Sequence, residues 1–371
     1  MDLNDIRQKV GQLFVIGFQG FEPSDDVKKF IKDNNMGGVI FFDRNISSPA
    51  QLGDLTNELQ DLRLNQNEPQ LFMSIDMEGG RVARLKAPFT QWPAMNILGE
   101  IGSASLGFKF AESMGRELLA VGLNLNFSPC VDVLTNPENK VIGDRSFGKD
   151  PELVSKMSSS LVRGFLKSGV LPCVKHFPGH GDTLLDSHED LPHIKHDMAR
   201  LESVEFIPFK KAFRARTELV MTAHIILEAV DPQFPATLSP KVITDLLKNK
   251  LGYRKAVITD DMEMKAVTKH YSASQAAIAA VNAGCTMLLY CHTLETQQEA
   301  FEAVVKAVSE GQIKLSIIEK NYEQVVKIKK ENLKPYVPVD VTKIAKEIGH
   351  PDHLKLSKQI ARKEIPAGLA T

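Results

Sequence analysis

Eight short apolar segments alternate along the chain with longer segments of helical periodicity, and this alternation limits the possible folds more than any other feature. The apolar segments are LFVIGF (13–18), GGVIFF (37–42), LFMSID (71–76), LNLNFSPCVDV (123–133), VLPCVKHF (170–177), LVMTAHI (219–225), KAVITDD (255–261) and TMLLYC (286–291). Nearly continuous apolar strands that are each followed by a helix are typical of a parallel sheet covered by helices. Eight such units predict an α/β fold, a (β/α)8 TIM-type barrel.

The segments between these strands predict the helices of the barrel. Apolar residues recur at helical spacing over 49–66, 104–122, 153–168, 198–215, 239–250, 272–284 and 294–310. After about residue 333 the pattern changes to a proline-punctuated connector, followed by a basic helical tail at 354–364. We therefore expect a barrel over residues 1–332, and a connector with a short C-terminal helical extension over 333–371.

Composition and charge narrow the class of protein and its partners. The chain is 43% hydrophobic and 25% charged with a net charge of −1, which is typical of a globular protein and gives no reason to expect nucleic acid or an anionic membrane as a partner. Neither a signal peptide nor a membrane-spanning apolar run is recognisable, so we expect a cytoplasmic protein. The four cysteines, in apolar surroundings, are expected to be buried thiols rather than disulfides.

Polar residues that follow the apolar segments are the candidates for a functional site, because active sites of such barrels lie at the carboxyl ends of the strands. Asp76 ends the third segment, and Arg84 follows it closely. Arg145 lies in a glycine-flanked loop, and Lys175 and His176 lie near the end of the fifth segment. For any one of these residues, a structural ion pair or a solvated loop charge is an alternative interpretation.

Two adjacent acids, Asp260 and Asp261, end the seventh segment. Successive side chains on an extended chain point in opposite directions, so we expect only one of the two to face the mouth of the barrel.

The stretch from Val174 to His196 contains five histidines, which raises the question of a metal site. His176 and His180 are four residues apart, but Pro178 and Gly179 break the helix that a zinc-binding pair at this spacing needs. We therefore expect no metal and no cofactor. The remaining chemistry is acid/base and nucleophilic, with a histidine oriented by Asp186 and acting together with a carboxylate such as Asp260.

These segments resemble glycoside hydrolase family 3, in particular its β-N-acetylhexosaminidase branch, which includes the bacterial β-N-acetylglucosaminidases of peptidoglycan recycling. The similarity rests on KHFPGHGDTLLDSHEDLP, together with DMEGGRVARL, VIGDRSFG, MTAHI and ITDDMEM in the same order, and it spans roughly residues 8–330. In this chain, Met77 stands where many relatives carry Gln.

The resemblance implies a retaining glycosidase that releases terminal β-linked N-acetylglucosamine from an oligosaccharide or a muropeptide. It implies Asp260 as the nucleophile and His188 as the acid/base, with Asp186 as the partner of His188. The residues that match the family's sugar-binding positions are Asp76, Arg84, Arg145, Lys175 and His176.

Other functions remain as alternatives at this point. Relatives with a histidine acid/base include enzymes that transfer the glycosyl group to phosphate, and the cations near the site would suit an anionic acceptor. A hexosaminidase directed at chitooligosaccharides, a metal-dependent hydrolase and a sugar-binding protein without catalysis are further candidates, although the intact Asp260, His188 and Asp186 argue against the last.

Overall fold

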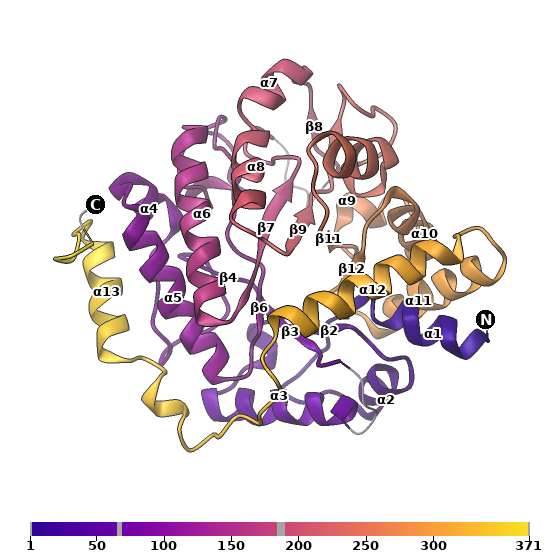
Figure 1. Cartoon of the computed structure of the whole chain (residues 1–371), viewed down its shortest axis with the longest axis horizontal. Helices are drawn as coiled ribbons and strands as arrows, with labels where there is room; N and C mark the ends of the chain where they lie inside the picture. The colour runs from indigo at the N-terminus through magenta and orange to yellow at the C-terminus, as the bar shows by residue number, and fades with distance from the viewer. Residues whose placement is uncertain (1, 65–68, 184–189, 370–371) are drawn as a thin grey trace.

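Eight parallel strands close into a barrel in the computed structural model, which describes residues 2–64, 69–183 and 190–369 (Figure 1). The strands follow one another around the barrel in chain order, and the last pairs with the first. They are β1 (Phe14–Ile16), β2 (Gly38–Phe41), β3 (Phe72–Ile75), β6 (Leu125–Asn126), β7 (Leu171–Phe177), β9 (Leu219–Thr222), β11 (Ala256–Asp261) and β12 (Met287–Tyr290). Each lies within one of the eight apolar segments, so the predicted TIM-type barrel is confirmed.

Helices cover the outside of the barrel in the segments that connect the strands. They are α2 (Asp25–Asp33), α3 (Pro49–Leu64), α5 (Ala104–Ala120), α6 (Pro151–Ser168), α8 (Phe206–Arg214), the π-helix η4 (Lys241–Lys250), α10 (Ala273–Ala283) and α11 (Leu294–Ser309). Capping residues fix several of their ends. In α10, the Ser272 hydroxyl accepts from the backbone N–H of Gln275, and Gly284 ends the helix with a φ of +111°.

Two predicted helices differ from the observed ones. The segment 198–215 forms two helices, α7 (Met198–Ser203) and α8, because the backbone at Val204 leaves the helical conformation, with φ −129° and ψ −71°. The tail helix α13 (Pro351–Ala361) begins three residues before position 354. Pro351 takes its first position, and the His350 side chain accepts from the N–H of Asp352.

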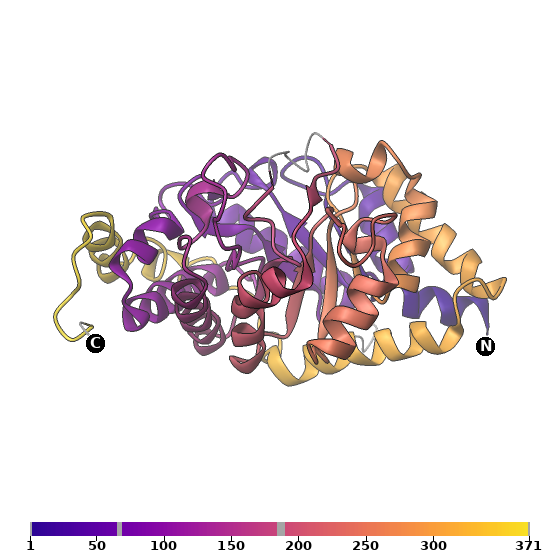
Figure 2. The ribbon, with the colours of Figure 1, turned by 90° about the horizontal axis from the view of Figure 1, so that it is seen from above.

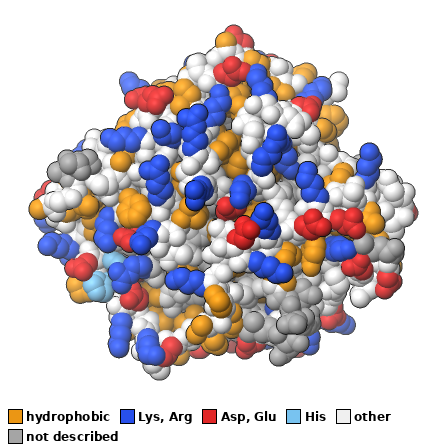
Figure 3. Space-filling model, in the orientation of Figure 1, with side chains coloured by type: hydrophobic (Ala, Val, Ile, Leu, Met, Phe, Trp, Pro, Cys, Tyr) orange, Lys and Arg blue, Asp and Glu red, His pale blue; other side chains and the backbone are white. Residues whose placement is uncertain are grey.

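Helix α12 (Leu315–Asn332) crosses the end of the barrel at which the strands begin (Figure 2). The ammonium of Lys329 donates to the Gly37 carbonyl (2.7 Å), and the Asn321 amide donates to the Cys285 carbonyl (3.1 Å). Lysine, arginine and acidic side chains are spread over this face of the molecule (Figure 3). The opposite end of the barrel, where the strands finish, is the one left open to a ligand.

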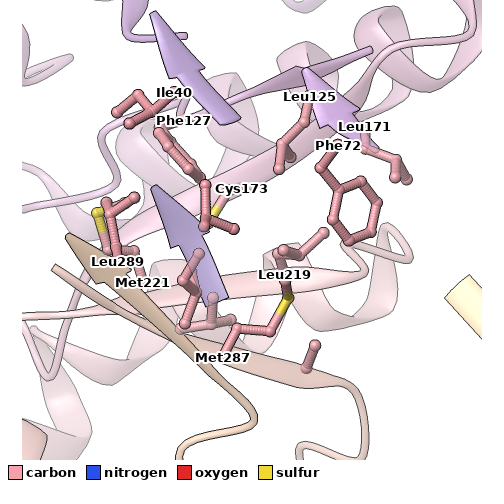
Figure 4. Close-up of a cluster of buried hydrophobic side chains, with 14 of the residues drawn as sticks. Ile40, Phe72, Leu125, Phe127, Leu171, Cys173, Leu219, Met221, Met287 and Leu289 are labelled. Atoms are coloured by element: carbon pink, nitrogen blue, oxygen red, sulfur yellow. The ribbon is translucent and has the colours of Figure 1, made fainter. Parts of the chain in front are cut away.

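The barrel interior is filled by apolar side chains from neighbouring strands (Figure 4). Phe72 from β3, Leu171 from β7 and Leu219 from β9 are all buried, as are Ile40, Leu125, Phe127, Cys173, Met221, Met287 and Leu289. All four cysteines are buried and free, as the sequence predicts. The interior formed by the described residues is therefore a packed core rather than a channel, as is usual for such a barrel.

Residues after α12 run back across the outside of the barrel and end in α13. The Asn57 side chain pairs with both backbone polar groups of Val339 (2.7 and 2.9 Å), which fixes the connector against α3. Helix α13 packs on α5 and α4 (Met95–Ile101), where His353 Nδ1 lies 2.8 Å from the buried carboxylate of Glu117. Ile360 on this helix is buried in the same apolar cluster as the barrel.

Short helices, strands and turns lie in the segments outside the barrel strands, most of them near the strand ends. They are α1 (Leu3–Gly11), the β4–β5 hairpin (Met77–Gly79 and Val82–Ala83), β8 (His193–Ile194) paired with β10 (Ile226–Leu227), α9 (Lys265–Thr268), and the 3-10 turns η1 (Asp43–Asn45), η2 (Gly143–Arg145), η3 (Ala236–Leu238) and η5 (Ile344–Lys346). Among the described residues, no helix has the length and apolar character needed to span a membrane.

Candidate active site

A cavity of about 440 Å³ opens at the carboxyl ends of the strands. Ile40, Met221 and Leu289 from the barrel interior also line it, so its inner end is closed by the core (Figure 4). The predicted site residues that border it are Asp76, Arg84, Arg145, Lys175, His176 and Asp260. The other two predicted residues, His188 and Asp186, lie outside the described residues.

Glu78, in strand β4, is a fully buried carboxylate behind the wall of the cavity. It accepts two hydrogen bonds from the guanidinium of Arg145 (2.8 and 2.9 Å), and it lies 2.7 Å from the ammonium of Lys175. Burial opposes ionisation of this carboxyl, but the two cations outweigh it and hold the pKa of Glu78 well below its usual range. Glu78 is therefore an anion that holds two cations of the cavity wall in place.

Lys175, almost completely buried in β7, joins this group to Asp76 at the end of β3. Its ammonium donates to Asp76 Oδ1 at 2.6 Å. Burial opposes the charge on Lys175, but Asp76 and Glu78 raise its pKa above the usual value, so the side chain is a cation at neutral pH. Lys175 and Asp76 together place a donor and an acceptor beside each other, which suits recognition of sugar hydroxyls.

Arg84, which follows β5, presents donors to the same cavity. Its guanidinium lies 4.0 Å from Asp76 Oδ2 and 3.9 Å from Asp43, and it stacks over the ring of Phe42. Among the described residues, the buried Nε of Arg84 has no hydrogen-bond partner. A buried donor without a partner is costly unless a ligand or water satisfies it, so Arg84 fits the predicted role in ligand binding.

His176, the residue after Lys175, is held between an acid and a guanidinium. Its Nδ1 lies 2.7 Å from Asp132 Oδ2, and its Nε2 lies 3.2 Å from Arg145 Nη2. Asp132 is fully buried, and it also accepts from the backbone N–H of His180 at 2.6 Å. Burial opposes ionisation of Asp132, but its interactions with His176 and His180 lower its pKa to about 2.

Asp260 and Asp261 at the end of β11 have different surroundings. The carboxylate of Asp261 accepts from the N–H groups of Glu263 and Cys291 (both 3.1 Å), and it also contacts His292 (3.2 Å). Asp260 accepts only from the N–H of Asp261 (2.8 Å) within the described part of the chain. Burial opposes ionisation of Asp260, but the imidazoles of His176 and His224 and this N–H lower its pKa below the usual range.

Both acids border the cavity, so the prediction that only one of them faces the mouth of the barrel is wrong. The reason is a shift of register in the pairing of β11 with β12 between Ile258 and Asp261, which interrupts the alternation of side chains. The carboxylate of Asp261 accepts hydrogen bonds from backbone N–H groups. Asp260, in contrast, is an ionised carboxylate at the cavity surface, and such a group can act as a nucleophile.

Comparison with known proteins assigns this arrangement to a family. Residues 5–328 match the glycosyl hydrolase family 3 N-terminal domain. The chain belongs to glycosyl hydrolase family 3. A family 3 β-N-acetylglucosaminidase from Paenibacillus sp. str. FPU-7 superposes with a TM-score of 0.90 at 40% identity, over 96% of this chain and 68% of that one.

Two β-hexosaminidases are also similar in sequence. β-Hexosaminidase A of Pseudoalteromonas piscicida is 31% identical over 396 residues, and the match covers 95% of this chain and 65% of that protein. β-Hexosaminidase of Alkalilimnicola ehrlichii is 36% identical over 298 residues, which is 79% of this chain and 83% of that protein. The chain thus spans less than two thirds of the first relative and most of the second.

The family 3 loop after β7 begins with a tight turn. Gly179 has a φ of +123°, which only glycine adopts readily, and a Cβ on Gly181 would lie 1.9 Å from the Val133 carbonyl oxygen. His180 is buried, and burial lowers its pKa to about 4. On the far side of the segment 184–189, His196 Nε2 lies 2.6 Å from Asp182, and the exposed His193 contacts Glu228.

One group of described residues has the spacing of a metal site, namely Cys130, Asp132 and His176. All three are buried and already bonded to one another, since the Cys130 thiol and His176 Nδ1 both contact Asp132 Oδ2. A cation bound by His176 Nδ1 would force the proton to Nε2, which faces the donor groups of Arg145. These residues of the family 3 site therefore do not fit a metal ion.

Sequence reasoning missed Glu78 and Asp132, although both hold residues that it found. Glu78 lies two positions after Asp76, and such residues lie on the same side of an extended chain, so alternation could have pointed to it. Asp132 is the last residue but one of the apolar segment 123–133, and its position near the end of that segment was the only signal.

Proposed function

We propose that this family 3 protein is an exo-acting β-N-acetylglucosaminidase that removes terminal β-linked N-acetylglucosamine with retention of configuration. The observation that carries the proposal is Asp260, an ionised carboxylate on a cavity that is closed at its inner end and lined by donors and acceptors suited to a sugar. The relatives named β-hexosaminidase and β-N-acetylglucosaminidase support the sugar specificity.

Asp260 acts as the nucleophile in this mechanism. Its free carboxylate oxygen attacks the anomeric carbon while the glycosidic C–O bond breaks, which gives a covalent glycosyl ester. His188, oriented by Asp186, donates a proton to the leaving oxygen and then removes one from the attacking water, which releases the sugar and restores Asp260. The assignments of His188 and Asp186 rest on the sequence resemblance, since both lie outside the described residues.

The sugar is held by Asp76, Arg84, Arg145, Lys175 and His176. Lys175 and Arg145 donate to hydroxyl oxygens, and Asp76 accepts from hydroxyl protons, so each hydroxyl can be satisfied in both directions. The core closes the inner end of the cavity, which favours the terminal residue of an oligosaccharide over an internal one.

Peptidoglycan fragments (muropeptides) are the natural substrates that we propose, with the cytoplasm as the site of action. The motif resemblance to recycling enzymes supports the substrate class, and four buried free thiols fit a reducing compartment. Turnover of muropeptides and of chitobiose, measured side by side, would test this choice, and a preference for chitobiose would contradict it.

A panel of aryl glycosides tests the proposed reaction. We expect turnover of the β-N-acetylglucosaminide and little turnover of the β-glucoside. Asp260→Asn should reduce kcat by more than about 1000-fold. The matched control is Asp261→Asn, whose amide oxygen can still accept from the N–H groups of Glu263 and Cys291, so it should retain most activity. Equal losses in the two variants would contradict the assignment of the nucleophile.

Phosphate as the acceptor is tested in the same assay. Lys175 and Arg145 are already neutralised by Asp76 and Glu78, so they do not form an open anion site, and we expect water to be the acceptor. Free N-acetylglucosamine should remain the main product in phosphate buffer. Accumulation of N-acetylglucosamine 1-phosphate would show a phosphorylase instead.

A further inference from the structure

We propose that Asp132 is a positioning residue that fixes the tautomer of His176, so that His176 Nε2 accepts a hydrogen bond from a hydroxyl of the bound sugar. The inference rests on the proposed function, because it assigns His176 Nε2 as the acceptor for one hydroxyl of the sugar substrate. It concerns a residue outside the cavity that acts through its neighbour.

Asp132 determines the protonation of His176 Nδ1. Its Oδ2 lies 2.7 Å from His176 Nδ1, and its two oxygens also receive the N–H of His176 (3.3 Å), the N–H of His180 (2.6 Å) and the Cys130 thiol (3.2 Å). These donors stabilise the ionised form, and an ionised carboxylate can only accept hydrogen bonds. His176 Nδ1 must therefore carry a hydrogen.

Arg145 determines the protonation of His176 Nε2, on the opposite side of the ring. Its Nη2 lies 3.2 Å from His176 Nε2, and a guanidinium has donors but no acceptor. Glu78 holds Arg145 through two hydrogen bonds, so the guanidinium cannot easily turn away. Nε2 must therefore present its lone pair, which agrees with the hydrogen on Nδ1.

The tautomer matters for ligand binding because it decides whether His176 adds an acceptor to the carboxylates of Asp76 and Asp260 or a further donor to the cations of the cavity wall. Arg84, Arg145 and Lys175 only donate, whereas a sugar hydroxyl needs an acceptor for its own proton. Nε2 supplies that acceptor beside Arg145, so one hydroxyl can donate to His176 while it accepts from the guanidinium. The opposite tautomer would place two donors face to face and leave the hydroxyl proton without a partner.

The tautomer can be measured directly in the unmodified protein. We expect ¹⁵N NMR of the full chain, with His176 assigned by comparison with H176Q, to show Nδ1 protonated and Nε2 unprotonated at pH 7. A protonated Nε2 on the neutral ring would overturn the proposal. This measurement needs no folded Asp132 variant and does not depend on turnover.

The role in binding is tested with Asp132→Asn and a set of monodeoxy substrates. The amide of D132N can donate to Nδ1, so the tautomer is no longer imposed. We expect kcat/KM for the aryl N-acetyl-β-glucosaminide to fall about 100-fold, which is the size of effect of an unsatisfied polar group. Cys130→Ala is the matched control, because it removes another contact of the same carboxylate, and it should stay within about threefold.

Deoxy substrates separate positioning from a general structural effect. Among the 3-, 4- and 6-deoxy analogues, one lacks the hydroxyl that binds Nε2, and for this analogue D132N should cost less than about fivefold. Equal losses on the parent substrate and all three analogues would show a merely structural role and would contradict the proposal. Absence of turnover by the unmodified protein would instead contradict the proposed function and leave the NMR result unaffected.

Discussion

At the scale of single residues, two buried carboxylates hold the groups that face the ligand. Glu78 fixes Arg145 and Lys175, and Asp132 fixes His176. Neither acid stands out in the sequence, because the cations and the histidine that they fix lie at least 44 positions away along the chain. The sequence predicts the cations and the histidine from their places at strand ends, but only the closed barrel shows which acids hold them.

Removing the buried charge of Glu78 should destabilise the protein strongly. Glu78→Gln removes the negative charge that neutralises the buried cations Arg145 and Lys175, and breaking such a buried ion pair costs about 3–5 kcal/mol of stability. Denaturant unfolding measures this loss. Asp144→Asn is the control, since it breaks the exposed ion pair with Arg81 and should change the unfolding free energy by less than about 0.5 kcal/mol. Similar effects of the two substitutions would contradict the role of Glu78.

The lowered pKa of Asp132 predicts a dependence of stability on pH. The group has a pKa of about 2 when folded, against an ordinary value of 3.8, so its contribution is fully present above about pH 4 and is lost as the pH falls towards 2. The size is on the order of 2 kcal/mol. The difference in unfolding free energy between the native protein and D132N should therefore shrink from pH 6 to pH 2. A constant difference over this range would contradict the interpretation.

At the scale of elements, all eight strands are predictable because each is a continuous apolar segment. Helix boundaries are less predictable where the chain departs from periodicity, as at Val204, where the predicted helix 198–215 breaks in two. The shift of register in β11 leaves no trace in the sequence, yet it decides that both Asp260 and Asp261 border the cavity. The predicted segment 272–284, in contrast, agrees with α10, which Ser272 and Gly284 cap.

The turn after β7 should tolerate no side chain at Gly181. A Cβ there would lie 1.9 Å from the Val133 carbonyl oxygen, so Gly181→Ala should lower the unfolding free energy by about 3 kcal/mol. Gly311→Ala is the control, because that position has a φ of +76° and no atom within 4 Å of the added Cβ, so it should cost only about 1 kcal/mol. Thermal unfolding compares them, and an equal loss would show that the close approach to Val133 is unimportant.

At the scale of the whole molecule, the C-terminal extension packs on the barrel through α13. Buried apolar residues of the extension, Ile344, Leu356 and Ile360, belong to the same cluster as the barrel core. Trp92, the single tryptophan, lies 6.3 Å from the His353 ring and 4.9 Å from that of Phe110, so its fluorescence reports on the docking of α13.

We expect the extension and the barrel to unfold together. Tryptophan fluorescence and far-ultraviolet circular dichroism should give the same denaturant midpoint, because one apolar cluster joins the two parts. A fluorescence transition at clearly lower denaturant would show that α13 detaches first and that residues 333–371 form a separate unit.

The proposal that Asp260 is the nucleophile of a retaining glycosidase is tested most directly by trapping the covalent intermediate. An activated fluorinated analogue of N-acetylglucosamine, which slows hydrolysis of the glycosyl ester, should inactivate the protein with time. Mass spectrometry of the digested protein should then find the sugar mass on the peptide that contains Asp260, and D260N should stay unlabelled. A label on another residue, or turnover of the analogue without any labelled carboxylate and with inversion of configuration, would contradict the proposed mechanism.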